Sequence, residues 1–122
     1  MNVDTFLKTD RIPAFGETIG AENDRVFKQF GGKGGNQAIS IARLINDHSA
    51  IKVSMLGQVG SDNEGKQYLE YLKENKVDHA NVIVKENCVT GQSVVFTIKS
   101  SGLNSKIHVR GANQLYSEVF PE

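Results

Sequence analysis

The segment FGGKGGNQAISIARLI, residues 30–45, places four glycines and a lysine directly before a helical pattern. Apolar residues recur there at the spacing of one helix face, namely Ala38, Ile41, Ala42 and Ile45. This spacing predicts a helix over about residues 36–46 with that face buried. The first N–H groups of a helix have no partner within it, and glycine lets a ligand approach the backbone closely. The segment therefore predicts a site for an oxygen-rich ligand, the alternative being a glycine-rich turn that binds nothing.

Two common nucleotide-binding loops do not fit this segment. A Walker loop needs Ser or Thr after its Gly-Lys pair, but Lys33 is followed by Gly34. The dinucleotide fingerprint could begin at Gly32 and Gly34, but its third glycine position holds Gln37. A generic anion site at the N-terminus of the helix does fit, although it selects no particular substrate.

The segments before and after this helix also carry strand and helix patterns. Weak alternation over residues 1–30 predicts short strands joined by a turn. The stretch IKVSMLGQVG, residues 51–60, predicts one buried strand that leads into a turn. Ser61 and Glu64 fit a capping box at the start of a second helix. The apolar stripe of that helix is Tyr68, Leu69 and Leu72.

The C-terminal part of the chain predicts only strands. Residues 81–84 form one, and residues 92–110 form a hairpin with Gly102 in its turn. The first hairpin strand has two alternating sets, either of which can face a ligand: Val94, Phe96 and Ile98, or Ser93 and Val95. The element order ββαβαβββ predicts an α/β fold with an appended antiparallel sheet. Two helices and one convincing buried strand are too few to close a parallel sheet on both faces, so we also expect an incomplete domain.

Composition excludes several classes of function. Lys and Arg number 14 and so do Asp and Glu, so a basic footprint for nucleic acid is absent. No apolar run approaches the about 20 residues that span a bilayer, and the N-terminus lacks the pattern of a signal peptide. The single Cys88 forms no internal disulfide, and the histidines share no zinc-ligand spacing with it. We therefore expect a cytoplasmic protein with no metal site that binds neither membranes nor nucleic acid.

Five short motifs, taken in order, resemble a known family. They are NVD at 2–4, RIPAFGET at 11–18, GGKGGNQA at 31–38, GQVGSD at 57–62 and GAN at 111–113. Together they resemble the N-terminal portion of the ribokinase-like carbohydrate kinase family, and the match runs nearly end to end. The version with Lys33, Asn36 and Gln37 is more similar to the ribose kinases of this family than to its adenosine or fructose kinases. Each motif alone is weak, but their order and spacing are specific.

The resemblance implies an incomplete three-layer α/β/α domain with an appended antiparallel β-sheet lid. Residues 1–122 would be a partial sugar-binding portion, with lid strands at about 5–30 and 92–110 and α/β core elements at about 36–85. The residues implied to bind the sugar are Asn2, Val3, Asp4, Gly32, Lys33, Gly34, Gly35 and Asn36. Because a carboxylate accepts hydrogen bonds from neighbouring hydroxyls, Asp4 suits a polyol. Gly35 stands where ribose kinases commonly have Ala, which implies a slightly more mobile loop.

The implied activity is ATP-dependent phosphorylation of D-ribose to ribose 5-phosphate, with Mg²⁺ and a monovalent cation such as K⁺ in the complete enzyme. The glycine-alanine-glycine-aspartate signature that holds the family's catalytic aspartate does not occur in these 122 residues, and the buried strand that precedes NVD is absent. We therefore expect a sugar half-site truncated at both ends, inactive alone, with no catalytic residue and no bound cofactor. The resemblance also implies a homodimer through the lid sheet. Two alternatives stay open: a non-catalytic dimerisation or regulatory module that uses the lid, and a generic phosphate-binding domain.

Overall fold

The computed structural model describes residues 1–22, 26–45 and 50–114. Its strands are β1 Asn2–Thr9, β2 Phe27–Gly31, β3 Val53–Ser54, β4 Gly57–Gly60, β5 Val77–Asp78, β6 Val82–Lys85, β7 Gly91–Ile98 and β8 Asn104–Val109. Its helices are α1 Lys33–Ile45 and α2 Asn63–Glu74, followed by a short 3₁₀ helix, η1, at Gly111–Gln114. The α/β class predicted from the sequence is confirmed.

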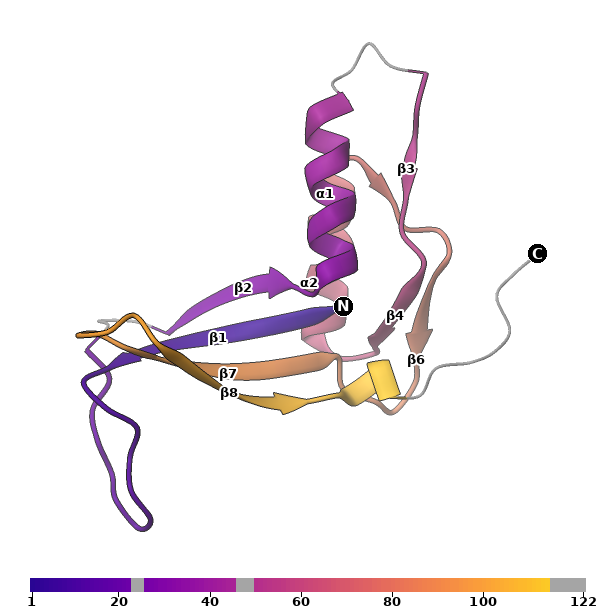
Figure 1. The fold of residues 1–122 in the computed structure, drawn as a ribbon. Coiled ribbons are helices and arrows are strands. Elements are labelled where there is room, and N and C mark those ends of the chain that lie inside the picture. Colours follow the sequence, from indigo (N-terminus) through magenta and orange to yellow (C-terminus); the bar gives the residue numbers. More distant parts are fainter. Residues whose placement is uncertain (23–25, 46–49, 115–122) are drawn as a thin grey trace.

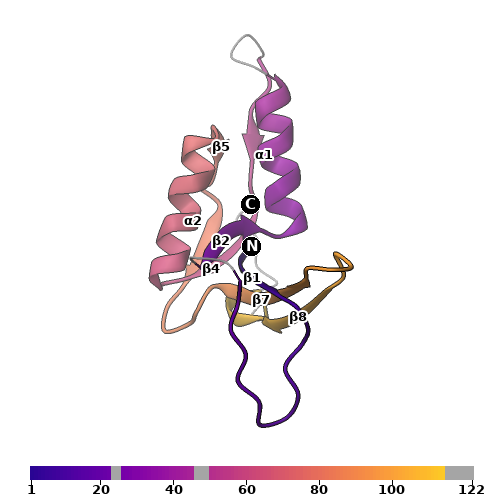
Figure 2. The same ribbon diagram turned by 90° about the vertical axis from the view of Figure 1, so that its left-hand side faces the viewer.

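The elements form two parts (Figure 1). One is a four-stranded sheet of order β2-β1-β7-β8, called the outer sheet below. The other is the α/β part, in which α1 and α2 lie on the same side of strands β3 to β6 (Figures 1 and 2). The outer sheet lies across the end of the α/β part at which α1 begins (Figure 1). The glycine loop, residues 31–35, therefore lies where the two parts meet.

The outer sheet is mixed rather than purely antiparallel. β1 pairs with β2 and β7 pairs with β8 in antiparallel fashion, as the sequence predicts for two hairpins. Between the hairpins, however, β1 and β7 run parallel over their whole length, from Asn2 opposite Gly91 to Thr9 opposite Ile98. The chain passes through both helices between these two strands, so no local pattern indicates their direction. The turn of the second hairpin contains Gly102 at a φ of 70°, which confirms the predicted role of that glycine.

The predicted single strand over residues 51–60 is wrong, because this stretch forms two strands. β3 pairs in parallel with β5, and β4 pairs in parallel with β6. Between β3 and β4 the Met55 N–H donates to the Asp78 carbonyl at 2.7 Å, while Leu56 is exposed. The sequence did not predict β5, because two residues are too few to show an alternating pattern.

Helix α1 begins earlier than predicted, and it buries only part of the predicted face: Ala38 is buried and Ala42 packs against the core, as predicted. It starts at Lys33 and includes two of the loop glycines, whereas its predicted end at Asn46 lies outside the described residues. The buried positions are Gly35, Ala38 and Ile39, and the predicted core residue Ile41 is 49% exposed. The face is set by α2, because Tyr68 packs against Gly35 and leaves no room for a side chain there.

Helix α2 is capped by Asp62, not by the predicted pair of Ser61 and Glu64. The Asp62 carboxylate accepts the Gly65 N–H at 3.0 Å, and it also accepts the backbone N–H and the hydroxyl of Thr90 at 2.9 and 2.6 Å. Glu64 instead pairs with Lys28 of β2 at 3.0 Å. Burial raises the pKa of Asp62, but the hydrogen bonds from Thr90 and Gly65 outweigh this effect and hold that pKa below its usual value. Asp62 thus links the start of α2 to the start of β7.

The hydrophobic core joins both helices to the strands, and its buried members are Val3, Ala38, Ile39, Val59, Tyr68, Leu72, Val77 and Val82. Phe30 of β2 stacks on Tyr71 at a centroid distance of 4.8 Å and meets Tyr68 edge to face at 5.3 Å. The fully buried Tyr68 hydroxyl donates to the Gly31 carbonyl at 2.6 Å. Burial raises the pKa of Tyr68 to about 12, so this hydroxyl stays protonated and remains a donor. The core thereby holds the glycine loop through the hydrogen bond from Tyr68 to Gly31.

Candidate functional site

Strand pairing brings two of the motifs together. In the β1–β2 register Asn2 lies opposite Gly31 and Asp4 lies opposite Gln29. A Cβ on Gly31 would lie 2.6 Å from Asp4 Oδ2, which is too close for any side chain. Glycine at position 31 therefore leaves the space that the Asp4 carboxylate occupies, and the NVD motif and the glycine loop form one site.

Three donors converge on one oxygen of Asp4. Its Oδ1 accepts hydrogen bonds from Asn2 Nδ2, from Ser93 Oγ and from Lys106 Nζ, the last at 2.9 Å. The Asp4 side chain is 15% exposed. Burial raises the pKa of Asp4, but the hydrogen bonds from Ser93, Lys106 and Asn2 and the charge of Lys106 outweigh it, so that pKa lies below its usual value. Asp4 is a charged acceptor held in place by the protein.

The other two residues of the NVD motif are buried. Asn2 is 6% exposed, and its Nδ2 donates to Ser93 at 2.9 Å as well as to Asp4. Its Oδ1 is buried and has no hydrogen-bond partner among the described residues. The Val3 side chain is 4% exposed and belongs to the hydrophobic core. Asp4 is thus the residue of this motif that presents its side chain at the surface.

The glycine loop follows the start of β1 closely. Gly32 has a φ of 91°, a conformation that glycine adopts easily, and a Cβ there would lie 3.4 Å from the Asn2 nitrogen. A Cβ on Gly34 would lie 3.3 Å from the Met55 Cε. A Cβ on Gly35 would overlap the Tyr68 hydroxyl, so this glycine, read from the sequence as a source of mobility, has a packing role. Lys33 is exposed at the first position of α1.

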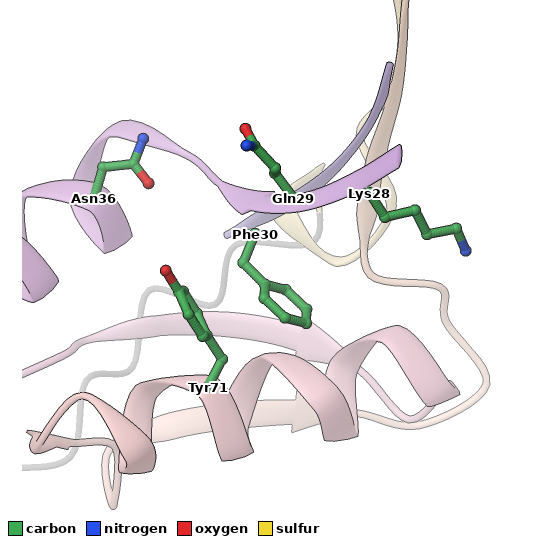
Figure 3. Close-up of a pocket in the computed structure, with 5 residues that line it drawn as sticks. All are labelled: Lys28, Gln29, Phe30, Asn36 and Tyr71. Carbon is green, nitrogen blue, oxygen red and sulfur yellow. The ribbon is translucent and has the colours of Figure 1, made fainter. Parts of the chain in front are cut away.

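Asn36 lines a pocket on the helix side of β2 (Figure 3). The pocket has a volume of about 370 Å³ and is lined by Lys28, Gln29, Phe30, Asn36 and Tyr71. In the close-up the Asn36 amide and the Tyr71 hydroxyl both point into the space beside Gln29 and Phe30 (Figure 3). Gln29 also lies opposite Asp4 in the β1–β2 register, so one residue of the pocket lining is a direct cross-strand neighbour of Asp4.

Several residues of the site could not be chosen from the sequence. Ser93 contacts Asp4, so the Ser93 and Val95 set shares a sheet face with that carboxylate, a choice that the alternation had left open. Lys106 and Gln29 reach the site only through strand register. No local signal identifies these contacts, because they join residues that are far apart in the chain.

The GAN motif holds the start of β1. The Asn113 side chain donates from Nδ2 to the Met1 carbonyl at 2.7 Å, and its Oδ1 accepts from the Met1 nitrogen at 2.9 Å. Gly111 adopts a φ of 52° at the start of η1, and the Ala112 N–H donates to the Val89 carbonyl at 2.8 Å. By holding Met1, the motif therefore helps to position Asn2 and Asp4, although it is not itself part of the outer sheet.

Two further kinds of feature bear on function, namely long apolar helices and clusters of metal-ligating side chains. No helix within residues 1–22, 26–45 and 50–114 has the length and apolarity needed to cross a bilayer. Over the same ranges, no three side chains of His, Cys, Asp or Glu lie together as a metal site. Polar groups converge on Asp4, whose Oδ1 accepts hydrogen bonds from Asn2, Ser93 and Lys106.

Comparison with known proteins gives the family. Residues 1–119 match the pfkB family of carbohydrate kinases. The chain belongs to this family. This pfkB-family chain is 42% identical to the ribokinase of Schizosaccharomyces pombe over 113 residues, which is 93% of the chain and 35% of that relative. It is 34% identical to the ribokinase of Mus musculus over 105 residues, which is 86% of the chain and 30% of the relative.

Solved structures of ribokinases share the fold of this pfkB-family chain. The Arabidopsis thaliana ribokinase complexed with ribose and ATP matches with a TM-score of 0.79 and 34% identity, covering 99% of the chain and 37% of that structure. The ribokinase of Cryptococcus neoformans in complex with ADP matches with a TM-score of 0.72 and 31% identity, covering 92% and 32%. The chain thus spans about a third of the length of the relatives that it matches. The predicted resemblance and the fold class are both confirmed.

Proposed function

We propose that this chain provides the sugar-binding half-site of a ribokinase-type reaction, in which ATP phosphorylates D-ribose to ribose 5-phosphate. The observation that carries the proposal is the Asp4 carboxylate, whose Oδ1 is held by Asn2 and Ser93 while its Oδ2 points to Gly31. A fixed carboxylate beside a glycine loop suits a polyol, because hydroxyl groups donate to it and the backbone can approach the ring. The identity to ribokinases over most of the chain supports ribose as that polyol.

Each residue of the half-site has a proposed role. Asp4 accepts hydrogen bonds from the sugar, and Asn2 holds Asp4 rather than offering its own buried amide. Val3 contributes backbone only, since its side chain lies in the core. Gly32, Gly34 and Gly35 bring the backbone close to the sugar, and the exposed Lys33 and Asn36 side chains add donors at the start of α1.

Phosphoryl transfer needs further groups. The attacking hydroxyl must be oriented by a base such as an aspartate, and the transferred charge must be neutralised. The family signature with this aspartate does not occur in the 122 residues, so we propose that this chain alone binds ribose without phosphorylating it. ATP, Mg²⁺ and a monovalent cation such as K⁺ belong to the complete reaction, and we propose that this chain alone binds none of them. The neutral composition and the single Cys88 support a cytoplasmic setting.

The outer sheet is proposed to act as a lid and as a homodimer surface. All six residues of β8 are exposed, and they include Ile107 at 65% and Val109 at 53%. Exposed apolar residues on an edge strand favour association. The same observation favours the second candidate, a non-catalytic dimerisation module. Analytical sedimentation tests this homodimer surface. We expect the wild type to be a dimer and Ile107→Glu to be a monomer, and a monomeric wild type would contradict the proposal.

Calorimetric titration with ribose separates the candidates. The half-site predicts heat with ribose, and Asp4→Asn should weaken binding by about 10- to 100-fold because a charged acceptor is lost. Asp10→Asn removes the same charge just beyond the far end of β1 and serves as the matched control. Heat with inorganic phosphate but not ribose would favour the generic anion site. No heat with ribose would favour the non-catalytic module.

A further inference from the structure

The three donors on Asp4 Oδ1 are held with different firmness. Asn2 and Ser93 are 6% and 3% exposed, lie on the two central strands, and are hydrogen-bonded to each other. The Lys106 side chain is 42% exposed and comes from the edge strand β8. A partly exposed ion pair from a long, flexible side chain contributes little stability, so Lys106 is the donor that leaves most easily.

The register shows how Lys106 reaches the carboxylate. Asp4 lies opposite Ser93, and Lys106 lies opposite Val95, two residues further along β7. Residues directly opposite each other share a sheet face, as do residues two apart in one strand, so all four lie on the same face. To bring its Nζ within 2.9 Å of Asp4, the Lys106 side chain crosses β7 diagonally over this face. Its ammonium group therefore occupies space from which a ligand would approach Asp4.

The limited hydrogen-bond capacity of Asp4 Oδ1 makes the Lys106 ammonium group and a ligand hydroxyl compete for this atom. A carboxylate oxygen has two lone pairs, and Oδ1 already has three donors. In a bidentate arrangement, two neighbouring hydroxyls donate one hydrogen bond to each oxygen of the carboxylate. The first hydroxyl would take Oδ2, which none of these three donors reaches. The second needs a place at Oδ1, and one of the donors must leave.

We propose that Lys106 is a displaceable cap on Asp4, which the second hydroxyl of a vicinal diol replaces when the sugar binds. This inference rests on the proposed function. Lys106 is then not a catalytic residue but a specificity-determining one, because a ligand with a single hydroxyl does not displace it. It also couples the sugar site to β8, since the edge strand loses its ion pair to Asp4 when the sugar enters.

The first test needs no sugar. Carbon-13 NMR of the Asp4 carboxyl carbon follows its titration in the wild type, in Lys106→Met and in the control Lys99→Met. The control removes an equal charge from the second hairpin, where Lys99 pairs with Glu22 at 2.9 Å. We expect Asp4 to titrate at higher pH in Lys106→Met and at the wild-type pH in Lys99→Met. Identical titration in all three proteins would overturn the proposal, because the ion pair would then not exist in solution.

The second test measures ribose binding by calorimetry at low and at moderate salt. Lys106→Met should bind ribose about two- to fivefold more tightly than the wild type at low salt, the range expected for a partly exposed ion pair. Wild-type affinity should rise with salt, which screens the competing pair, whereas the affinity of Lys106→Met should not. Lys106→Arg should behave as the wild type.

The outcomes separate the cap from the proposed function. If the wild type binds ribose and Lys106→Met binds it equally or more weakly, the cap is wrong while the sugar site stands. If neither protein binds ribose, the proposed function fails and the cap fails with it.

Discussion

Replacing Gly35 with alanine tests how α2 holds the glycine loop. The new Cβ would lie less than 3.0 Å from the Tyr68 hydroxyl oxygen and 3.3 Å from its ring carbon Cζ. That hydroxyl cannot retreat, because Tyr68 is fully buried and donates to the Gly31 carbonyl at 2.6 Å. We expect Gly35→Ala to lower the free energy of unfolding by about 1–3 kcal/mol through overpacking. The higher helix propensity of alanine offsets up to about 1 kcal/mol of this loss.

Tyr68→Phe removes the overlapping atom and reveals the coupling. Alone it should lower the free energy of unfolding by about 1–3 kcal/mol, because the buried Gly31 carbonyl loses its donor. In that background the Cβ of Gly35→Ala meets the ring carbons Cζ at 3.3 Å and Cε1 at 3.7 Å, and a small shift relieves the closer contact. The double variant should therefore be more stable than the sum of the single effects predicts, by about 1–3 kcal/mol.

Urea unfolding followed by circular dichroism measures all four corners of this cycle. Gly34→Ala is the matched control, because its Cβ would meet the flexible end of Met55 at 3.3 Å and should not couple to Tyr68→Phe. If the losses in the free energy of unfolding from Gly35→Ala and Tyr68→Phe add to within about 0.5 kcal/mol, the overlap between the new Cβ and the Tyr68 hydroxyl does not limit stability, contrary to our expectation.

Three further predictions concern the supports of the site. Asp62→Ala should lower the free energy of unfolding by about 1–3 kcal/mol, because α2 loses its N-cap and the Thr90 N–H loses its acceptor. Urea unfolding measures this change, and a variant as stable as the wild type would contradict the prediction. The pKa values of Asp4 and Asp62 lie below the usual value, so both stabilise the fold above about pH 4 and cease to do so as the pH falls through their folded pKa values. The free energy of unfolding of the wild type should fall from neutral to acid pH, and that of Asp62→Ala should fall less. An equal dependence on pH in the two proteins would contradict this prediction. Asn113→Ala should speed hydrogen exchange at the start of β1, and unchanged exchange there would show that the GAN motif does not hold this strand.

Local patterns predicted the elements that depend on neighbouring residues. The helix after the glycine loop, the second hairpin and its Gly102 turn all follow from short-range spacing. The cap of α2 was wrong because Asp62 also bonds to Thr90, a contact that competes with the capping box and that only the folded chain contains. The prediction that Ile41 lies in the core was wrong, because spacing alone does not show which side of a helix faces its partner helix.

The candidate site was predicted in part. Asp4 and the glycine loop came from the motifs, and the structure places Asp4 against Gly31. Ser93 and Lys106 could not be predicted, because their contacts with Asp4 depend on the parallel pairing of β1 with β7 and on the register of β8. Sequence alternation shows that two sets of side chains exist on a strand, but it does not show which set faces a given carboxylate.

We propose that a polyol binds between Asp4 and the start of α1. Nitrogen-15 NMR of the chain during titration with ribose tests it directly. We expect saturable shifts that cluster at the amides of Asp4, residues 31–36 and Ser93. No shifts at millimolar ribose, or shifts confined to the far ends of α1 and α2, would contradict it.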